Sequence, residues 1–144
     1  MKLFTIGFTK KSAEDFFEIL KKNNVKRLID IRLNTKSQLA GFAKQNDLKY
    51  FLKQIGNIEY QYMADLAPTK ELLDGYQEKR VSWEQYEKEY IAILDKRAIL
   101  ANMEYSTFEN ACLLCSESVA KQCHRRLAAE YIAKANKAIE IIHL

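Results

Sequence analysis

The chain has 144 residues, of which 48% are hydrophobic and 29% are charged. This length and composition exclude a largely disordered chain and predict a single domain over residues 1–144 with a substantial core. The formal net charge of +4 suits an anionic ligand, and it is too small to require a nucleic-acid partner.

The N-terminal part of the chain predicts a strand, a helix and a second strand. The first strand is Leu3–Ile6, a short run of β-favouring residues. Ser12 and Asp15 have the spacing of a capping box, which begins a helix over about Ala13–Lys22. The second strand is Arg27–Ile31, and two strands joined through a helix usually pair in parallel.

A polar stretch, Leu33–Gln45, follows the second predicted strand. We interpret it as a functional loop because it starts at the carboxyl end of a strand. A helix then begins at Asn46 or Asp47 and ends at Gly56. The alternating segment Glu59–Tyr62 is the third predicted strand.

The third quarter of the chain is predicted to be helical. Pro68 and Thr69 open a short helix. Ser82 and Gln85 form a second capping box before a longer helix. We also predict helix over Arg97–Phe108.

The C-terminal part predicts the strand at the centre of the sheet. Ala111–Leu114 is continuously apolar, as in a strand that is buried on both faces. A helix over about Gln122–Lys134 and a last strand, Ile139–Ile142, complete the chain. This alternation predicts an α/β fold: a three-layer α/β/α domain with a mostly parallel central sheet.

The strongest cluster of reactive side chains lies between the central strand and the helix that follows it. Ligands of open α/β sheets bind at the carboxyl ends of the strands, and helix N-termini attract anions. We therefore predict that Cys115, Cys123 and His124 are catalytic and that Glu117 and Arg125 bind an anionic substrate. The alternatives are a buried structural thiol at Cys115 and a structural histidine at His124.

A second cluster follows the second predicted strand. Asp30 and Arg32 are two residues apart, so they point to the same face of the strand at its carboxyl end. We predict a catalytic Asp30 and an anion-binding Arg32, and a framework ion pair between them is the alternative. Thr5 and an anion-binding Gly7, at the end of the first strand, complete the same rim.

The cysteines are predicted to be reduced. Their number is odd, and the apolar run at the N-terminus is too short for a signal peptide or a membrane span, so we expect a cytoplasmic protein with no disulfide and no membrane partner. The alternative is a reversible bond between Cys115 and Cys123, which could approach each other across the pocket. Cys112 is interpreted as core packing.

Thiolate and imidazole groups suit zinc, so a metal ion held by Cys115, Cys123 and His124 is an alternative that stays open. Because adjacent helical side chains such as Cys123 and His124 diverge by about 100°, we predict no metal ion. We also predict no cofactor.

Four motifs resemble those of the domain of unknown function 488 family, whose usual motifs read TIGHS or TIGYS, VDVR and LLCAE…CHR. They are TIGF near the start, LIDIR, LLCSE and CHRRLAAEYI. The resemblance implies an α/β domain whose motif residues gather at one end of the sheet. These residues are Gly7, Asp30, Arg32, Cys115, Glu117, Cys123, His124 and Arg125.

Two functions stay open at this point. The first is an enzyme that acts on a small anionic or nucleotide-like substrate at the carboxyl edge of the sheet. It is not a copy of a phosphatase or rhodanese, because Lys121 stands where the C-x5-R loop needs arginine. The alternative is a nucleic-acid-binding or nucleic-acid-processing module without catalysis of its own. Its contacts would come from Arg32, Lys36, Lys44, Lys49 and Lys53, with Phe42 or Tyr50 stacking on a base.

Overall fold

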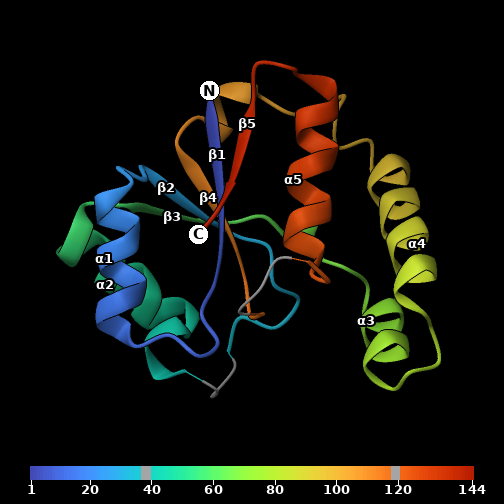
Figure 1. Cartoon of the computed structure of the whole chain (residues 1–144), viewed down its shortest axis with the longest axis horizontal. Coiled ribbons are helices and arrows are strands. Elements are labelled where there is room, and N and C mark those ends of the chain that lie inside the picture. Colours follow the sequence, from blue (N-terminus) through green and yellow to red (C-terminus); the bar gives the residue numbers. More distant parts are fainter. Residues whose placement is uncertain (37–39, 118–120) are drawn as a thin grey trace.

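The computed structural model describes residues 1–36, 40–117 and 121–144, and it contains one sheet of five strands (Figure 1). All neighbouring strands are parallel, in the order β3-β2-β4-β1-β5. The α/β prediction with a parallel sheet is therefore confirmed. The strands are β1 (Lys2–Gly7), β2 (Arg27–Asp30), β3 (Glu59–Tyr62), β4 (Ala111–Cys115) and β5 (Glu140–His143).

Helices cover both faces of the sheet (Figure 1). Helices α1 and α2 lie on one face, while α5 lies on the other, with α4 and α3 beyond it. None of these helices, within the part of the chain that is described, is long and apolar enough to cross a membrane. Their bounds are α1 (Ala13–Lys22), α2 (Gln45–Gly56), α3 (Lys70–Gln77), α4 (Trp83–Lys96) and α5 (His124–Ala135).

The core is divided by the sheet into two apolar clusters. Successive side chains of a strand point to opposite faces, so Leu3 packs on the α5 side while Phe4 and Ile6 pack on the α1 and α2 side. Every residue of β4 is buried, which explains the continuous apolar run that predicted this strand. The buried sheet therefore fixes the positions of the carboxyl ends of β1, β2 and β4, from which the next segments of the chain start.

The two N-caps that the capping-box patterns predicted, Ser12 and Ser82, are confirmed. Ser12 and Ser82 are the N-caps of α1 and α4, and their hydroxyls accept hydrogen bonds from the backbone N–H groups of Asp15 and Gln85. An N-cap hydroxyl satisfies a helical donor that has no carbonyl partner.

The predicted helix over Arg97–Phe108 is wrong. Helix α4 ends at Lys96, and Ala98 has a φ of 54°, which a right-handed helix cannot contain. Only Tyr105–Phe108 forms a short 3-10 helix. Helix α2 also starts slightly earlier than predicted, with Lys44 as its N-cap. Part of the predicted Leu33–Gln45 loop, residues 37–39, lies outside the described residues.

Candidate functional site

A cleft of about 240 Å³ opens at the carboxyl edge of the sheet. Its walls come from the ends of β1, β2 and β4, from the start of α5, and from α3 and α4. Parallel strands bring these ends to one edge, as the sequence predicted. The predicted site residues that line the cleft are Arg32, Cys115, Glu117, Cys123 and His124.

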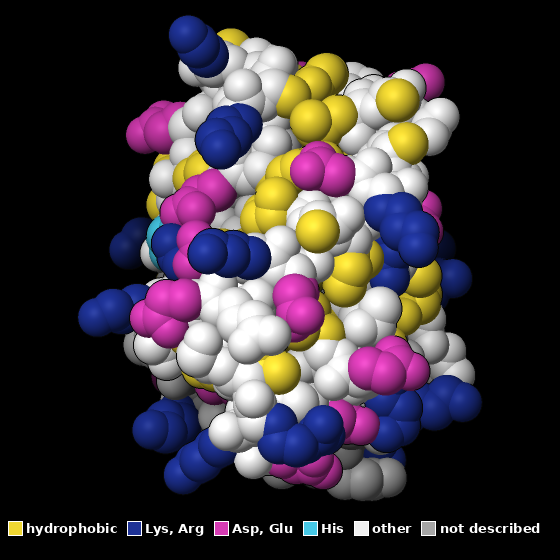
Figure 2. Space-filling view, turned by 90° about the vertical axis from the view of Figure 1, so that its right-hand side faces the viewer, with side chains coloured by type: hydrophobic (Ala, Val, Ile, Leu, Met, Phe, Trp, Pro, Cys, Tyr) yellow, Lys and Arg dark blue, Asp and Glu magenta, His cyan; other side chains and the backbone are white. Residues whose placement is uncertain are grey.

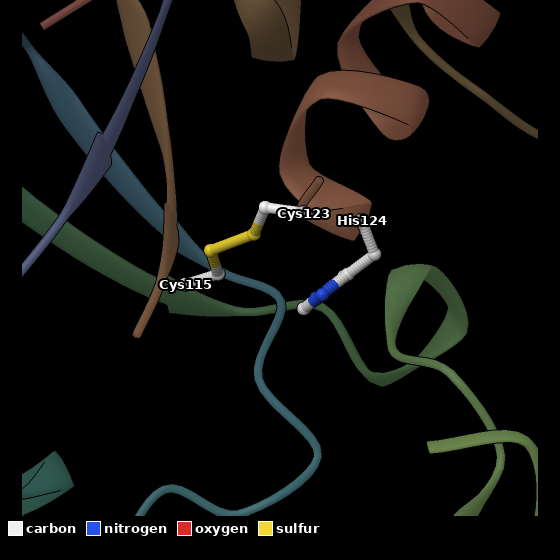
Figure 3. A group of neighbouring side chains, drawn as sticks. All are labelled: Cys115, Cys123 and His124. Atoms are coloured by element: carbon white, nitrogen blue, oxygen red, sulfur yellow. A yellow bond between two sulfur atoms is a disulfide. The ribbon is translucent and has the colours of Figure 1, made fainter. Parts of the chain in front are cut away.

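Cys115 and Cys123 meet at the floor of this cleft (Figure 3). Cys115 is the last residue of β4, and Cys123 is the N-cap of α5. Their sulfurs are joined in a disulfide, with the Cα atoms 7.7 Å apart. The prediction that all cysteines are reduced is therefore wrong for this pair, because the strand end and the helix start are adjacent. Cys112 is free and buried, and burial raises the pKa of its thiol.

His124 is the first residue of α5 and is half-buried beside the disulfide (Figure 3). Its Nε2 lies 2.8 Å from the carbonyl oxygen of Ile31. A carbonyl can only accept, so Nε2 carries the proton of the neutral ring. Burial lowers the pKa of His124 to about 4, although the hydrogen bond to Ile31 opposes this shift. The ring is thus neutral near pH 7, and Nδ1 keeps a lone pair.

Asp30 and Arg32 form a buried ion pair at the end of β2. The Nε and Nη2 atoms of Arg32 each donate to one carboxylate oxygen of Asp30 over 2.8 Å. The hydroxyl of Tyr60 donates to the same carboxylate over 2.6 Å. Asp30 is therefore engaged as a counter-ion behind the cleft, as in the framework alternative.

The remaining nitrogen of Arg32 has a different environment. Nη1 is buried and has no hydrogen-bond partner among the described residues. The guanidinium carbon of Arg32 lies over the Phe8 ring, 5.4 Å from its centre. This cation–π contact helps to hold the guanidinium in place. Arg32 and Phe8 both line the cleft, so this Nη1 nitrogen belongs to a residue of the cleft lining.

Arg125 is almost fully buried, at 1% exposure, and does not line the cleft in the described part of the chain. Its Nε donates to the hydroxyl of Thr5 over 3.3 Å, and its Nη1 lies 3.6 Å from the sulfur of Cys115. Nη1 also donates to the backbone carbonyl of Glu117. Arg125 therefore lies behind the Cys115–Cys123 pair, with its positive charge close to the sulfur of Cys115.

Gly7 explains how Arg125 can come so close to β1. A Cβ atom at this position would overlap the carbonyl of Glu117 and the guanidinium of Arg125. The glycine thus allows a close approach of β1 to the segment that follows β4. It belongs to the framework of the site, and it is not part of the cleft lining.

The outer wall of the cleft is aromatic, and sequence reasoning missed it. Trp83 and Tyr86 of α4 stack with their ring centres 5.1 Å apart, and Tyr76 of α3 lies 5.2 Å from Tyr86. All three rings line the cleft. No local signal in the sequence marks these three residues as neighbours of the CHR motif.

The basic residues of the nucleic-acid alternative lie apart from the cleft, except for Arg32. Lys49 and Lys53 line a separate hollow over α2 and β3. The ring of Phe42 packs 5.3 Å from that of Phe16, so its predicted stacking face is partly covered. Figure 2 shows the side of the molecule that carries α3 and α4, where acidic and basic side chains are interspersed.

Fold and site together define a class: a parallel α/β domain with a cysteine pair, a histidine and an arginine at the carboxyl edge of its sheet. The chain belongs to the family described as Domain of unknown function DUF488, whose model matches residues 12–132. The resemblance of its motifs is thereby confirmed. No curated protein and no solved structure matches the chain.

Proposed function

We propose that the protein is an enzyme that binds a small anionic substrate in the edge cleft through Arg32. The observation that carries this proposal is Nη1 of Arg32, a residue that lines the cleft: this nitrogen is buried and has no hydrogen-bond partner among the described residues. Leaving such a donor unsatisfied costs about 1–3 kcal/mol. A carboxylate or phosphate oxygen would satisfy the donor and pair with its charge.

The setting of Arg32 suits a binding role. Asp30 fixes two of its nitrogens, so little side-chain entropy is lost when a ligand takes the third. The ion pair as a whole is nearly neutral, which limits the cost of burying it without a ligand. Substrate binding would therefore complete an arrangement that already exists.

Reactive groups share the cleft with this donor. When reduced, Cys115 has the guanidinium of Arg125 beside its sulfur, which favours the thiolate form. His124 offers an unprotonated Nδ1 as an acceptor for a proton. A thiol nucleophile with a neighbouring base fits the predicted catalytic roles of Cys115, Cys123 and His124. The need for reduced thiols makes a cytoplasmic location part of this proposal.

The cleft also limits the substrate. Its volume of about 240 Å³ lies below the range of about 300–1,000 Å³ that is typical for drug-sized ligands. The rings of Tyr76, Trp83 and Tyr86 offer an apolar wall opposite the charged groups. We therefore propose a compact substrate with one anionic group and one apolar or planar part.

The direct test is anion binding by calorimetry, with inorganic phosphate and small carboxylates as probes. Arg32→Lys keeps a positive charge beside Asp30. It loses the planar guanidinium, which can bind the Asp30 carboxylate with two nitrogens and a ligand with the third. We expect a loss of affinity of about 10-fold or more, equal to about 1.4 kcal/mol. The matched control is Arg27→Lys, which alters an exposed ion pair with Glu59 outside the cleft. It should bind as the unaltered protein does.

Two results would overturn the proposal. One is the absence of binding for every anion tested, and the other is equal affinity in the unaltered protein and in Arg32→Lys. Binding of mixed oligonucleotides that falls steeply with salt and ignores Arg32→Lys would favour the nucleic-acid alternative instead.

A further inference from the structure

We infer that the reduced protein holds one zinc-type metal ion through Cys115 Sγ, Cys123 Sγ and His124 Nδ1, with a fourth position open to the cleft. The inference deepens the proposed function, and it rests on that function only for the use of the open position. It replaces the expectation of no metal, whose geometric reason does not hold in this fold.

The ligand atoms already converge. One donor atom each from Cys115, Cys123 and His124 lie within 4.8 Å of one another. Zinc binds sulfur at about 2.3 Å and imidazole nitrogen at about 2.0–2.1 Å, so tetrahedral ligands lie roughly 3.5–3.8 Å apart. Reduction of the disulfide frees the two sulfurs to move apart, and side-chain rotations would then bring the three ligand atoms to this spacing.

The adjacency of Cys123 and His124 is no obstacle. The expected divergence of about 100° holds for two residues inside a helix. Cys123 is instead the N-cap of α5, with extended backbone at φ −140° and ψ 141°. Its side chain is thereby free to turn toward the end of β4, and Figure 3 shows it reaching Cys115 while the ring of His124 lies alongside.

The orientation of His124 is that of a metal ligand. A ligating imidazole usually donates its other N–H to a carbonyl or carboxylate, which fixes the ring and its tautomer. Nε2 of His124 does this toward the carbonyl oxygen of Ile31 over 2.8 Å. The lone pair is then on Nδ1, the ring nitrogen bonded to Cγ, and a small rotation of the His124 side chain would direct it at the metal ion.

The charges and the backbone also fit. Two thiolates and a neutral imidazole balance a divalent cation, and the N–H of Arg125 near Cys115 Sγ stabilises a bound thiolate. The two Cα atoms are 7.7 Å apart, farther than the usual range of about 4.4–6.8 Å for a disulfide. Sulfurs that share a metal ion are not bonded to each other, so this separation suits them.

Metal loading begins with reduction of the disulfide. A phosphine reductant with one water molecule converts the disulfide to two thiols and is itself oxidised to the phosphine oxide. The divalent ion then displaces the two thiol protons, which go to solvent. Three protein ligands leave one tetrahedral position for water or substrate, as in catalytic zinc sites. An anion bound there would also be within the cleft that Arg32 lines.

The experiment uses the full chain, reduced with a phosphine without oxygen and titrated with Co²⁺ and then Zn²⁺. We expect one ion per chain, sulfur-to-cobalt charge-transfer bands, and the intense visible bands of tetrahedral Co²⁺, all removed by Zn²⁺. Cys123→Ser retains a good N-cap for α5, and it should lower the metal affinity by at least about 100-fold, since even altered supporting groups cost 10–100-fold. His124→Gln should weaken binding similarly.

The matched control is Cys112→Ala, which removes the free cysteine of β4 that lies outside the cluster. It should bind Co²⁺ like the unaltered chain. A folded, fully reduced protein that binds no Co²⁺ would overturn the inference, and so would Cys123→Ser with undiminished affinity. Either result would leave the proposed function standing if the metal-free protein still binds phosphate in a way that depends on Arg32. The metal site and the anion site can therefore be refuted independently.

Discussion

At the residue scale, most candidate side chains have partners that define their role. Asp30, for example, receives hydrogen bonds from Arg32 and Tyr60. Tyr60→Phe removes one bond to a buried carboxylate, which should lower the free energy of unfolding by about 1.5–3 kcal/mol. Urea denaturation measures this difference.

The control for that experiment is Tyr50→Phe, because the side chain of Tyr50 is 62% exposed. It should leave the unfolding midpoint nearly unchanged. Equal stability of the two variants would show that the hydroxyl of Tyr60 contributes nothing to the ion pair.

Gly7 provides a second test at the same scale. A Cβ atom there would overlap the backbone carbonyl of Glu117, so Gly7→Ala must displace the segment after β4. We expect a loss of about 3 kcal/mol or more in the free energy of unfolding. Gly41→Ala is the control, since a Cβ there meets no atom within 4 Å. A harmless Gly7→Ala would contradict the close approach described above.

The thiol of Cys112 gives a third prediction. Burial raises its pKa and shields it completely in β4. In the reduced native protein, iodoacetamide should therefore leave Cys112 unmodified until the chain unfolds, even at mildly alkaline pH. Mass spectrometry of peptides identifies the modified residues, and rapid labelling of Cys112 under native conditions would refute its placement in the core.

At the element scale, the ends of helices follow from backbone conformation. Ala98 adopts a φ of 54° directly after α4, a conformation that glycine accepts more readily than alanine. Ala98→Gly should therefore raise the free energy of unfolding by about 0.5–1 kcal/mol.

The paired variant is Ala92→Gly, at an exposed position inside α4. The same substitution should here lower the free energy of unfolding by about 1 kcal/mol. Opposite signs in thermal denaturation support the observed end of α4, and a loss of stability in both variants would contradict it.

Sequence reasoning predicted most elements because their signals are local. The run Ala111–Leu114 and the caps Ser12 and Ser82 each carry their information within a few residues. The predicted helix over Arg97–Phe108 was wrong because Ala98 adopts a left-handed conformation. Nothing in the amino-acid composition of this segment indicates such a conformation. Propensity could not foresee a conformation that the surrounding packing imposes.

At the scale of the whole molecule, topology predicted which strand ends meet. Arg32, Cys115, Cys123 and His124 line one cleft, as parallel strands require. The ion pair between Arg32 and Asp30 was one of the two alternatives that the sequence left open. The contact of Arg125 with Thr5 was not predictable, because it joins segments far apart in the chain. The aromatic wall from α3 and α4 also depends on packing between distant segments.

The most direct test of the central claim is a crystal structure of the reduced protein soaked in tungstate, a tetrahedral oxyanion with strong anomalous scattering. We expect one tungstate in the edge cleft, with an oxygen accepting a hydrogen bond from the buried Nη1 of Arg32. No anomalous peak in the cleft at saturating tungstate, with Nη1 still unpartnered, would contradict the claim that this cleft is an anion site.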